Sequence, residues 1–142
     1  AFPRVMLDKT RYDFSFSGLK SAVLNYLNGQ KMKNEAVNPN DVAASFQLAV
    51  IEVLVSKTIA CANSIGMKTI CMAGGVSCNS LLRKMMGQAA ADAGMTLYYP
   101  DPILCTDNAA MIGSMAYYNY INGEESDLSL NGIPGLKIGT RQ

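Results

Sequence analysis

The longest apolar region of the chain runs from Val42 to Ile65 and has the pattern of a helix. Its polar residues recur four and seven positions apart, which places them in one narrow stripe: Asp41, Ser45, Glu52, Ser56 and Asn63. This pattern predicts a helix over about 41–64 that packs on most of its circumference. Asn38-Pro39-Asn40 is a typical helix start, and Gly66 is a typical end.

A second pattern, centred on two glycines, follows this helix. The run from Thr69 to Ala73 is apolar without alternation, which predicts a buried strand. The Gly74-Gly75 pair predicts an abrupt turn, and apolar residues at helical spacing predict a helix over about 79–93, capped by Ser77 or Asn79. Such a junction presents backbone N–H groups that suit a phosphate, although ordinary turns share the pattern.

The remaining elements are shorter. Met95–Tyr99 has the composition of a second strand, and a last helix is expected from Cys105 through Tyr120, closely packed along its alanine and glycine positions. Near the start, Tyr12–Phe16 alternates like a short strand, and a helix is expected from Ser17 to about Asn28-Gly29. The tail after Gly123 is expected to be loose.

Strand, helix, strand and helix in succession predict an α/β fold, helix-rich, with a small and mostly parallel sheet joined by right-handed crossovers. We divide the chain into a strand and helix segment at 1–37, an α/β core at 38–123 and a tail at 124–142. A sheet this small seldom stands alone, so the chain is expected to oligomerise or to be part of a larger domain.

Composition and charge narrow the chemistry. The chain has 142 residues, is 49% hydrophobic and contains no histidine, which excludes Ser-His-Asp and Cys-His catalysis and zinc sites built on paired histidines. The net charge is +1, but residues 1–33 hold six basic and two acidic side chains. This excess of positive charge indicates either a basic edge that contacts phosphates or an ordinary solvated segment.

The cysteines and the polar residues of the long helix indicate the cellular compartment of the protein. The four cysteines form no Cys-x-x-Cys pair, which favours a reduced cytosolic protein. The apolar region is long enough to cross a bilayer but is interrupted by polar residues that a lipid-facing span rarely contains: Gln47, Glu52, Lys57 and Asn63. With no signal peptide at the start, a soluble, cytoplasmic protein with no membrane contact is expected.

Two loops lie where ligands bind in α/β folds, beyond the carboxyl ends of the strands: residues 74–79 and 104–108. If the strands pair, the loops are neighbours, and the first could hold a phosphate while Asn79 hydrogen-bonds a ligand. Asp107 could bind a cation, or it could cap the following helix. One carboxylate cannot hold a metal, so any further ligands would lie outside this chain.

Four motifs, in this order and spacing, resemble the TsaD family of tRNA N6-adenosine threonylcarbamoyltransferases, formerly described as O-sialoglycoprotein endopeptidases. They are Phe14-Ser-Phe-Ser-Gly-Leu-Lys20, Asp41-Val-Ala-Ala-Ser-Phe-Gln47, Ala73-Gly-Gly-Val-Ser-Cys-Asn79 and Cys105-Thr-Asp-Asn-Ala-Ala-Met-Ile112. The resemblance covers nearly all of this chain but only the C-terminal portion of the family's length. It implies an actin/Hsp70-like two-lobed fold, of which this chain would be part of the C-terminal lobe.

The resemblance also implies an activity: transfer of a threonylcarbamoyl group from threonylcarbamoyl-AMP to the adenosine beside the anticodon of tRNA. At matching positions, Gly74 and Gly75 would face the phosphate, Asn79 would bind the adenine nucleotide (ATP or threonylcarbamoyl-AMP), and Asp107 would ligate one iron or zinc ion. The family's other ligands belong to a His-x-x-x-His motif, which this chain lacks. Ser77 and Cys78 stand in the loop at positions where the family commonly has small residues such as alanine.

The implied partners are the missing N-terminal lobe, tRNA and, in a bacterium, TsaB- and TsaE-like proteins. We expect the chain alone to be inactive and to self-associate at high concentration. Two alternatives remain, a phosphotransferase or ATPase of the actin-like superfamily and a non-catalytic assembly module. The old protease description has little support, because no nucleophile–base pair can be built from these residues.

Overall fold

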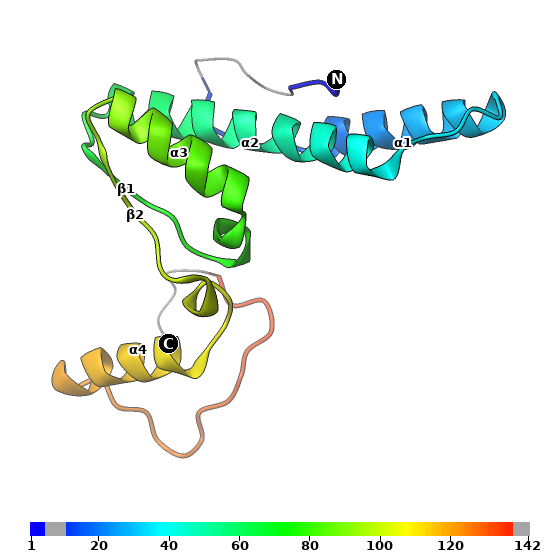
Figure 1. Cartoon of the computed structure of the whole chain (residues 1–142). Coiled ribbons are helices and arrows are strands. Elements are labelled where there is room, and N and C mark those ends of the chain that lie inside the picture. Colours follow the sequence, from blue (N-terminus) through cyan, green and yellow to red (C-terminus); the bar gives the residue numbers. More distant parts are fainter. Residues whose placement is uncertain (5–10, 138–142) are drawn as a thin grey trace. The chain divides into compact units, whose positions relative to one another are not determined.

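The computed structural model describes residues 1–4 and 11–137, which form two compact units, Ala1–Thr106 and Asp107–Gln142. The first unit holds three helices and a small sheet, and the second holds one helix and the tail (Figure 1). The division at 37 and 123 made from the sequence stays a prediction. Its segments 1–37 and 124–142 include residues 5–10 and 138–142, which lie outside the described residues.

The two helices that open the first unit begin and end at signals in the sequence. Helix α2, Pro39–Ser64, starts where expected, because the Asn38 side chain accepts a hydrogen bond from the Asn40 amide at 3.0 Å. Helix α1, Ser17–Met32, continues past the predicted stop at Gly29. One glycine inside a helix costs only about 1 kcal/mol, and the helix ends instead beside Asn34, whose φ is +54°.

The sheet has two parallel strands, β1, Thr69–Cys71, and β2, Thr96–Tyr98, with Ile70 opposite Leu97. Between them lie a 3₁₀ turn, η1, Gly75–Cys78, and helix α3, Ser80–Asp92. After β2 come the short 3₁₀ turn η2, Pro102–Leu104, and the end of the unit. The predicted parallel pairing and the helix between the strands are confirmed.

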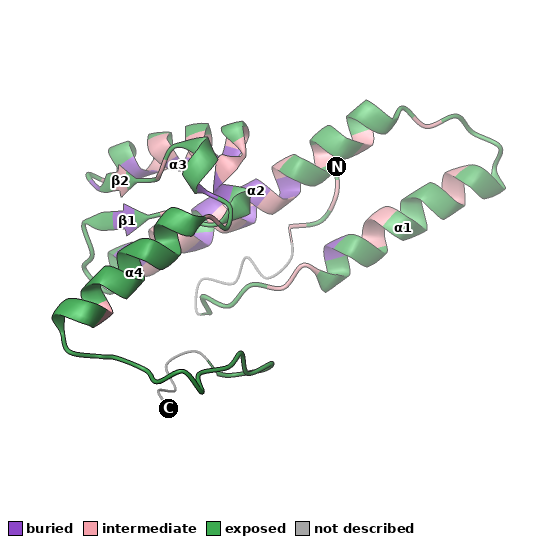
Figure 2. Ribbon diagram, turned by 90° about the horizontal axis from the view of Figure 1, so that it is seen from below, coloured by how far each residue is buried: buried purple, intermediate pink, exposed green. Residues whose placement is uncertain are grey.

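The core lies between the second half of α2, α3 and one face of the sheet, where the buried residues gather in Figure 2. Apolar side chains from the two helices form one cluster, and the helices and sheet form another: Ile51, Val55, Leu82 and Met86, then Ala62, Ile70, Ala90 and Met95. The first turns of α2 are mostly exposed. The expectation that α2 packs on most of its circumference is therefore wrong for its first half.

Two predicted strands differ from the structure. The strand predicted over 69–73 is shorter and only half covered, because Ile70 is buried while Thr69 and Cys71 are exposed. Residues 12–16 form no strand, and the two described strands pair only with each other. The buried Lys57 amine instead donates hydrogen bonds to the carbonyl oxygens of Arg11 and Asp13.

In the described part of the second unit the chain forms one helix, α4, Ala109–Ile121. It has no buried residue, so the expected close packing of this helix is wrong for the described residues. The spacing of apolar residues along a helix shows which side chains could enter a core, but it does not show whether another element packs against them. The tail after Gly123 has turns but no helix or strand through residue 137, as expected.

Helix α2 is also long and apolar enough, by length and composition, to cross a membrane. Two of its charged groups have protein partners: Glu52 pairs with Arg4, and Lys57 donates to backbone carbonyl oxygens. Its apolar residues pack on α3 and the sheet. These contacts are those of a helix in the core of an α/β protein.

Candidate functional site

The glycine pair turns the chain from β1 into η1. Gly74 has φ +83°, a conformation that other residues rarely adopt, whereas Gly75 has an ordinary φ and room for a Cβ, 3.9 Å from the Thr106 Cγ2 atom. Among the described residues the amides of Gly75 and Val76 have no hydrogen-bond acceptor. The turn therefore presents donors that an anion could use.

Asn79 ends this loop and starts α3. Its Oδ1 atom accepts a hydrogen bond from the Leu82 amide at 3.0 Å, and its Nδ2 atom donates to Gln47 Oε1 at 2.9 Å. Of the two predicted caps, Asn79 is the one used. The Ser77 hydroxyl is buried and donates to the Gly74 carbonyl oxygen at 2.7 Å. Asn79 keeps one N–H for a ligand.

The loop after β2 lies against the glycine loop, as the predicted pairing of the strands requires. The Cys78 thiol donates to the Pro102 carbonyl oxygen at 3.4 Å. Arg83 joins both loops, since its guanidinium donates to the carbonyl oxygens of Ser77 and Pro100 and lies 4.5 Å from the Tyr99 ring centroid. Both loops up to Thr106 thus form one site at the carboxyl ends of the strands.

Arg83 also donates to the Cys105 sulfur, at 3.2 Å. Hydrogen bonding by the Ser77 hydroxyl, by Cys78 and by Arg83 lowers the pKa of Cys105. Because the hydroxyl has one proton, Ser77 would turn from the Gly74 carbonyl to the sulfur as the thiolate forms. Burial, together with the neighbouring Cys105, raises the pKa of Cys78.

In the second unit, the residue that caps α4 is Asn108 and not Asp107. The Asn108 side chain accepts a hydrogen bond from the Met111 amide at 3.1 Å, and α4 has no acid in its first turn. Asp107 is exposed and follows directly on Thr106 in the chain. The alternative in which Asp107 serves as the helix cap is therefore wrong, and its carboxylate is not committed to that role.

The described residues cannot hold a metal ion by themselves, because they contain no cluster of three or more candidate ligands. Asp107 fits the part of one oxygen ligand. Nitrogen or further oxygen ligands would have to come from outside the described residues.

A comparison with protein families decides what kind of chain this is. The model of the family described as TsaD, tRNA N6-adenosine threonylcarbamoyltransferase, matches residues 1–114. The chain belongs to the TsaD family. The matched region contains both loops, Asn79 and Asp107, so the resemblance found through four motifs is confirmed.

Curated TsaD proteins match along almost the whole chain. A tRNA N6-adenosine threonylcarbamoyltransferase of Clostridioides difficile is 57% identical over 96% of this chain and 40% of its own length. Proteins of the same name from Clostridium beijerinckii and Moorella thermoacetica are 53% and 52% identical, over 99% and 96% of this chain and 41% and 40% of their own lengths. The chain thus spans about 40% of these TsaD relatives.

Arg83 is the site residue that the sequence analysis missed in this TsaD chain. A side chain in the first turn of a helix leans back toward the N-terminus, so a basic residue four positions after the cap Asn79 is expected to reach the preceding loop. The spacing of four residues between Asn79 and Arg83 is therefore the sequence feature from which this contact could have been predicted. Gln47 belonged to a quoted motif, but its contact with Asn79 joins residues 32 positions apart, and no local pattern predicts it.

Proposed function

We propose that this chain is part of the C-terminal, actin-like lobe of a cytoplasmic transferase that moves a threonylcarbamoyl group from threonylcarbamoyl-AMP to adenosine in tRNA. One observation carries the proposal: parallel pairing of β1 and β2 brings the glycine loop and the loop leading to Asp107 together. The names of the relatives support the reaction, and the α/β topology of the first unit is compatible with such a lobe.

Each candidate residue has a role in this proposal. The turn at Gly74 and Gly75 would receive the phosphate of the adenylate through backbone amides, and Asn79 would hydrogen-bond the nucleotide with its remaining N–H. Asp107 would supply one ligand to an iron or zinc ion held with histidines of the N-terminal lobe. That ion would polarise and position the substrate.

The reaction itself is an acyl transfer. The adenosine amine would attack the carbamoyl carbon, and AMP would leave with the electrons of the broken bond. No described residue of this chain is placed as general base, so its contribution is orientation and electrostatic stabilisation of the adenylate. The N-terminal lobe, tRNA and TsaB- and TsaE-like proteins are the proposed partners.

A chimera tests the function. This chain would be fused behind the part of the Clostridioides difficile relative that it does not match, and transfer of threonylcarbamoyl to tRNA would be measured. We expect the chimera to be active and the chain alone to be inactive. Because even second-shell changes at metal sites cost about 10- to 100-fold, Asp107→Asn should lower activity by about 100-fold or more.

The matched control is Asp101→Asn, since Asp101 is an exposed aspartate in the neighbouring loop with no hydrogen bond from its side chain to η2. Its chimera should retain activity. A folded but inactive chimera, or equal losses in the two variants, would contradict the proposal. Release of ADP from ATP without transfer to tRNA would instead support the phosphotransferase or ATPase alternative.

A further inference from the structure

The two cysteines of the site come from different loops and meet at the carboxyl ends of the strands. Cys78 is the last residue of η1, and Cys105 follows η2. Each thiol shifts the pKa of the other, which indicates that the two side chains lie close together. The other two cysteines, Cys61 and Cys71, are separate thiols on α2 and β1.

Backbone carbonyl oxygens and the Arg83 guanidinium fix the positions of the two sulfur atoms. Cys78 Sγ lies 3.4 Å from the Pro102 carbonyl oxygen, and Cys105 Sγ lies 3.4 Å from that of Asp101. Arg83 binds Cys105 Sγ from the side of α3 and also ties η1 to Pro100. The two sulfur atoms therefore lie beside the carbonyl oxygens of adjacent residues, and thiols this close together can form a bond between their sulfur atoms with a modest shift of the loops.

The two thiols differ in access to solvent. Cys78 is half-buried, whereas Cys105 is only 2% exposed. An oxidant therefore reaches the Cys78 sulfur more readily than the buried Cys105 sulfur. We propose that Cys78 and Cys105 form an oxidisable pair that a peroxide converts to a single disulfide linking η1 to the segment after η2.

The chemistry balances with hydrogen peroxide as the oxidant. The Cys78 sulfur attacks one peroxide oxygen, the O–O bond breaks, and the products are a sulfenic acid and water. The Cys105 sulfur then attacks the Cys78 sulfur, its proton and the sulfenic hydroxyl leave as water, and the S–S bond forms. In total, two thiols and one peroxide give one disulfide and two waters. A thiol reductant reverses the change by exchange.

The disulfide is detected by mapping peptides of the full chain. The reduced chain is exposed to hydrogen peroxide, the remaining thiols are alkylated, and the protein is digested with trypsin. We expect peptide 69–83 linked to peptide 85–137, with fragment ions that place the bridge at Cys78 and not at Cys71, and loss of the link after treatment with dithiothreitol.

Variants separate this pair from random oxidation. Cys71→Ser removes the other cysteine of peptide 69–83 and should leave the link intact. Cys105→Ser should abolish the link and leave a sulfenic acid at Cys78 that dimedone traps. Because Cys105 is buried and its replacement could impair folding, Cys78→Ser at the half-buried position provides a second test and should also abolish the link.

Two outcomes would overturn the proposal. One is alkylation of Cys78 and Cys105 to the same extent as Cys61 after peroxide treatment. The other is a set of links in which Cys71 takes part as often as Cys78.

A consequence for ligand binding rests on the proposed function. Because Cys78 precedes Asn79, a disulfide would fix the backbone next to the nucleotide-binding amide. The mapping experiment contains no ligand, so failure of the proposed function leaves its result unchanged. Absence of the link would refute the proposed disulfide between Cys78 and Cys105, and the proposed transferase function would be unaffected.

Discussion

Asn79 connects three parts of the first unit through one amide group. Its oxygen caps α3, and its nitrogen reaches Gln47 on α2. The cap of α3 therefore depends on Oδ1, whereas the contact with Gln47 depends on one N–H of the amide. Binding of an anionic nucleotide would depend on the other N–H and on the absence of negative charge. The capping role and the binding role can be separated by substitution.

We predict that Asn79→Asp preserves the cap and removes ligand binding. A carboxylate still accepts from Leu82 at the positive end of α3 and loses only the exposed hydrogen bond to Gln47, so the free energy of unfolding should stay near that of the wild type, whereas Asn79→Ala should lose about 1 kcal/mol. Both variants should bind ATP more weakly in calorimetric titration, the aspartate because it repels phosphate. ATP binding by Asn79→Asp equal to that of the wild type would contradict the assigned role.

Asp127 offers a pH-dependent turn in the tail. Hydrogen bonds from the hydroxyl and the amide of Ser129 lower the pKa of its carboxyl group. Because the ionised carboxylate is favoured in the turn, the turn remains formed at pH values below the ordinary pKa of an aspartate. It is lost as the pH falls through the lowered pKa of Asp127. The Ser129 amide resonance should titrate with that low midpoint, and Ser129→Ala should move the Asp127 midpoint upward. An unchanged midpoint in the variant would contradict this account.

At the scale of elements, α2 and α4 are both strongly apolar but differ in what covers them. Ile51 on α2 is 3% exposed and belongs to the core, whereas Ile112 on α4 is 73% exposed. Identical substitutions at the two positions therefore measure the packing of each helix.

We predict that Ile51→Val lowers the free energy of unfolding by about 1 kcal/mol, because one buried methylene group is lost. Ile112→Val should change it by less than about 0.5 kcal/mol, because the side chain is already in solvent. Denaturant unfolding of the two variants measures both changes. Equal losses would show that α4 is packed in solution.

Local signals predicted most of these elements from the sequence. The caps at Asn38 and Asn79 and the glycine turn at Gly74 depend on neighbouring residues only, and each was found. The strand predicted over 12–16 was wrong, because a strand needs a partner that no local pattern supplies. In the candidate site, Asp107 and Asn108 both suit a cap, and only the structure shows that Asn108 is used.

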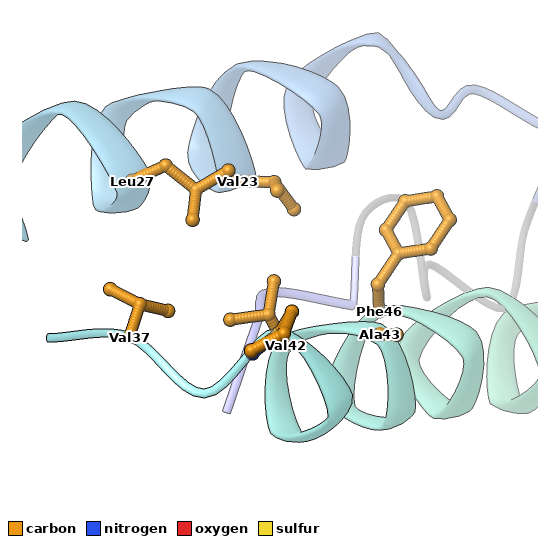
Figure 3. Close-up of a pocket in the computed structure, with 7 residues that line it drawn as sticks. Val23, Leu27, Val37, Val42, Ala43 and Phe46 are labelled. Carbon is orange, nitrogen blue, oxygen red and sulfur yellow. The ribbon is translucent and has the colours of Figure 1, made fainter.

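At the scale of the whole chain, apolar surface remains uncovered. A groove of about 520 Å³ lies between α1 and α2 and is lined by apolar residues: Val23, Leu27, Val37, Pro39, Val42, Ala43 and Phe46. In Figure 3, Val23 and Leu27 of α1 lie opposite Val42 and Phe46 of α2. The sheet of the described residues has only two strands, so its outer edges are also open. Surfaces of this kind favour association.

We predict that the chain self-associates as its concentration rises, which sedimentation velocity measures. Phe46→Lys places a charge in the groove and should shift the distribution toward the monomer. Met32→Lys is the matched control, because Met32 is 86% exposed and does not line the groove. If the two variants sediment alike, the groove is not the surface through which the chains associate.

The amine of Lys57 holds the segment around Arg11 and Asp13 against α2, and only 4% of this residue is exposed. It is therefore hidden from reagents that acetylate primary amines, unlike the exposed lysines at positions 20, 31 and 33. Brief acetylation of the folded chain should modify those three and spare Lys57, and acetylation in denaturant should modify all four. One lysine thus reports by mass spectrometry whether the N-terminal segment is docked.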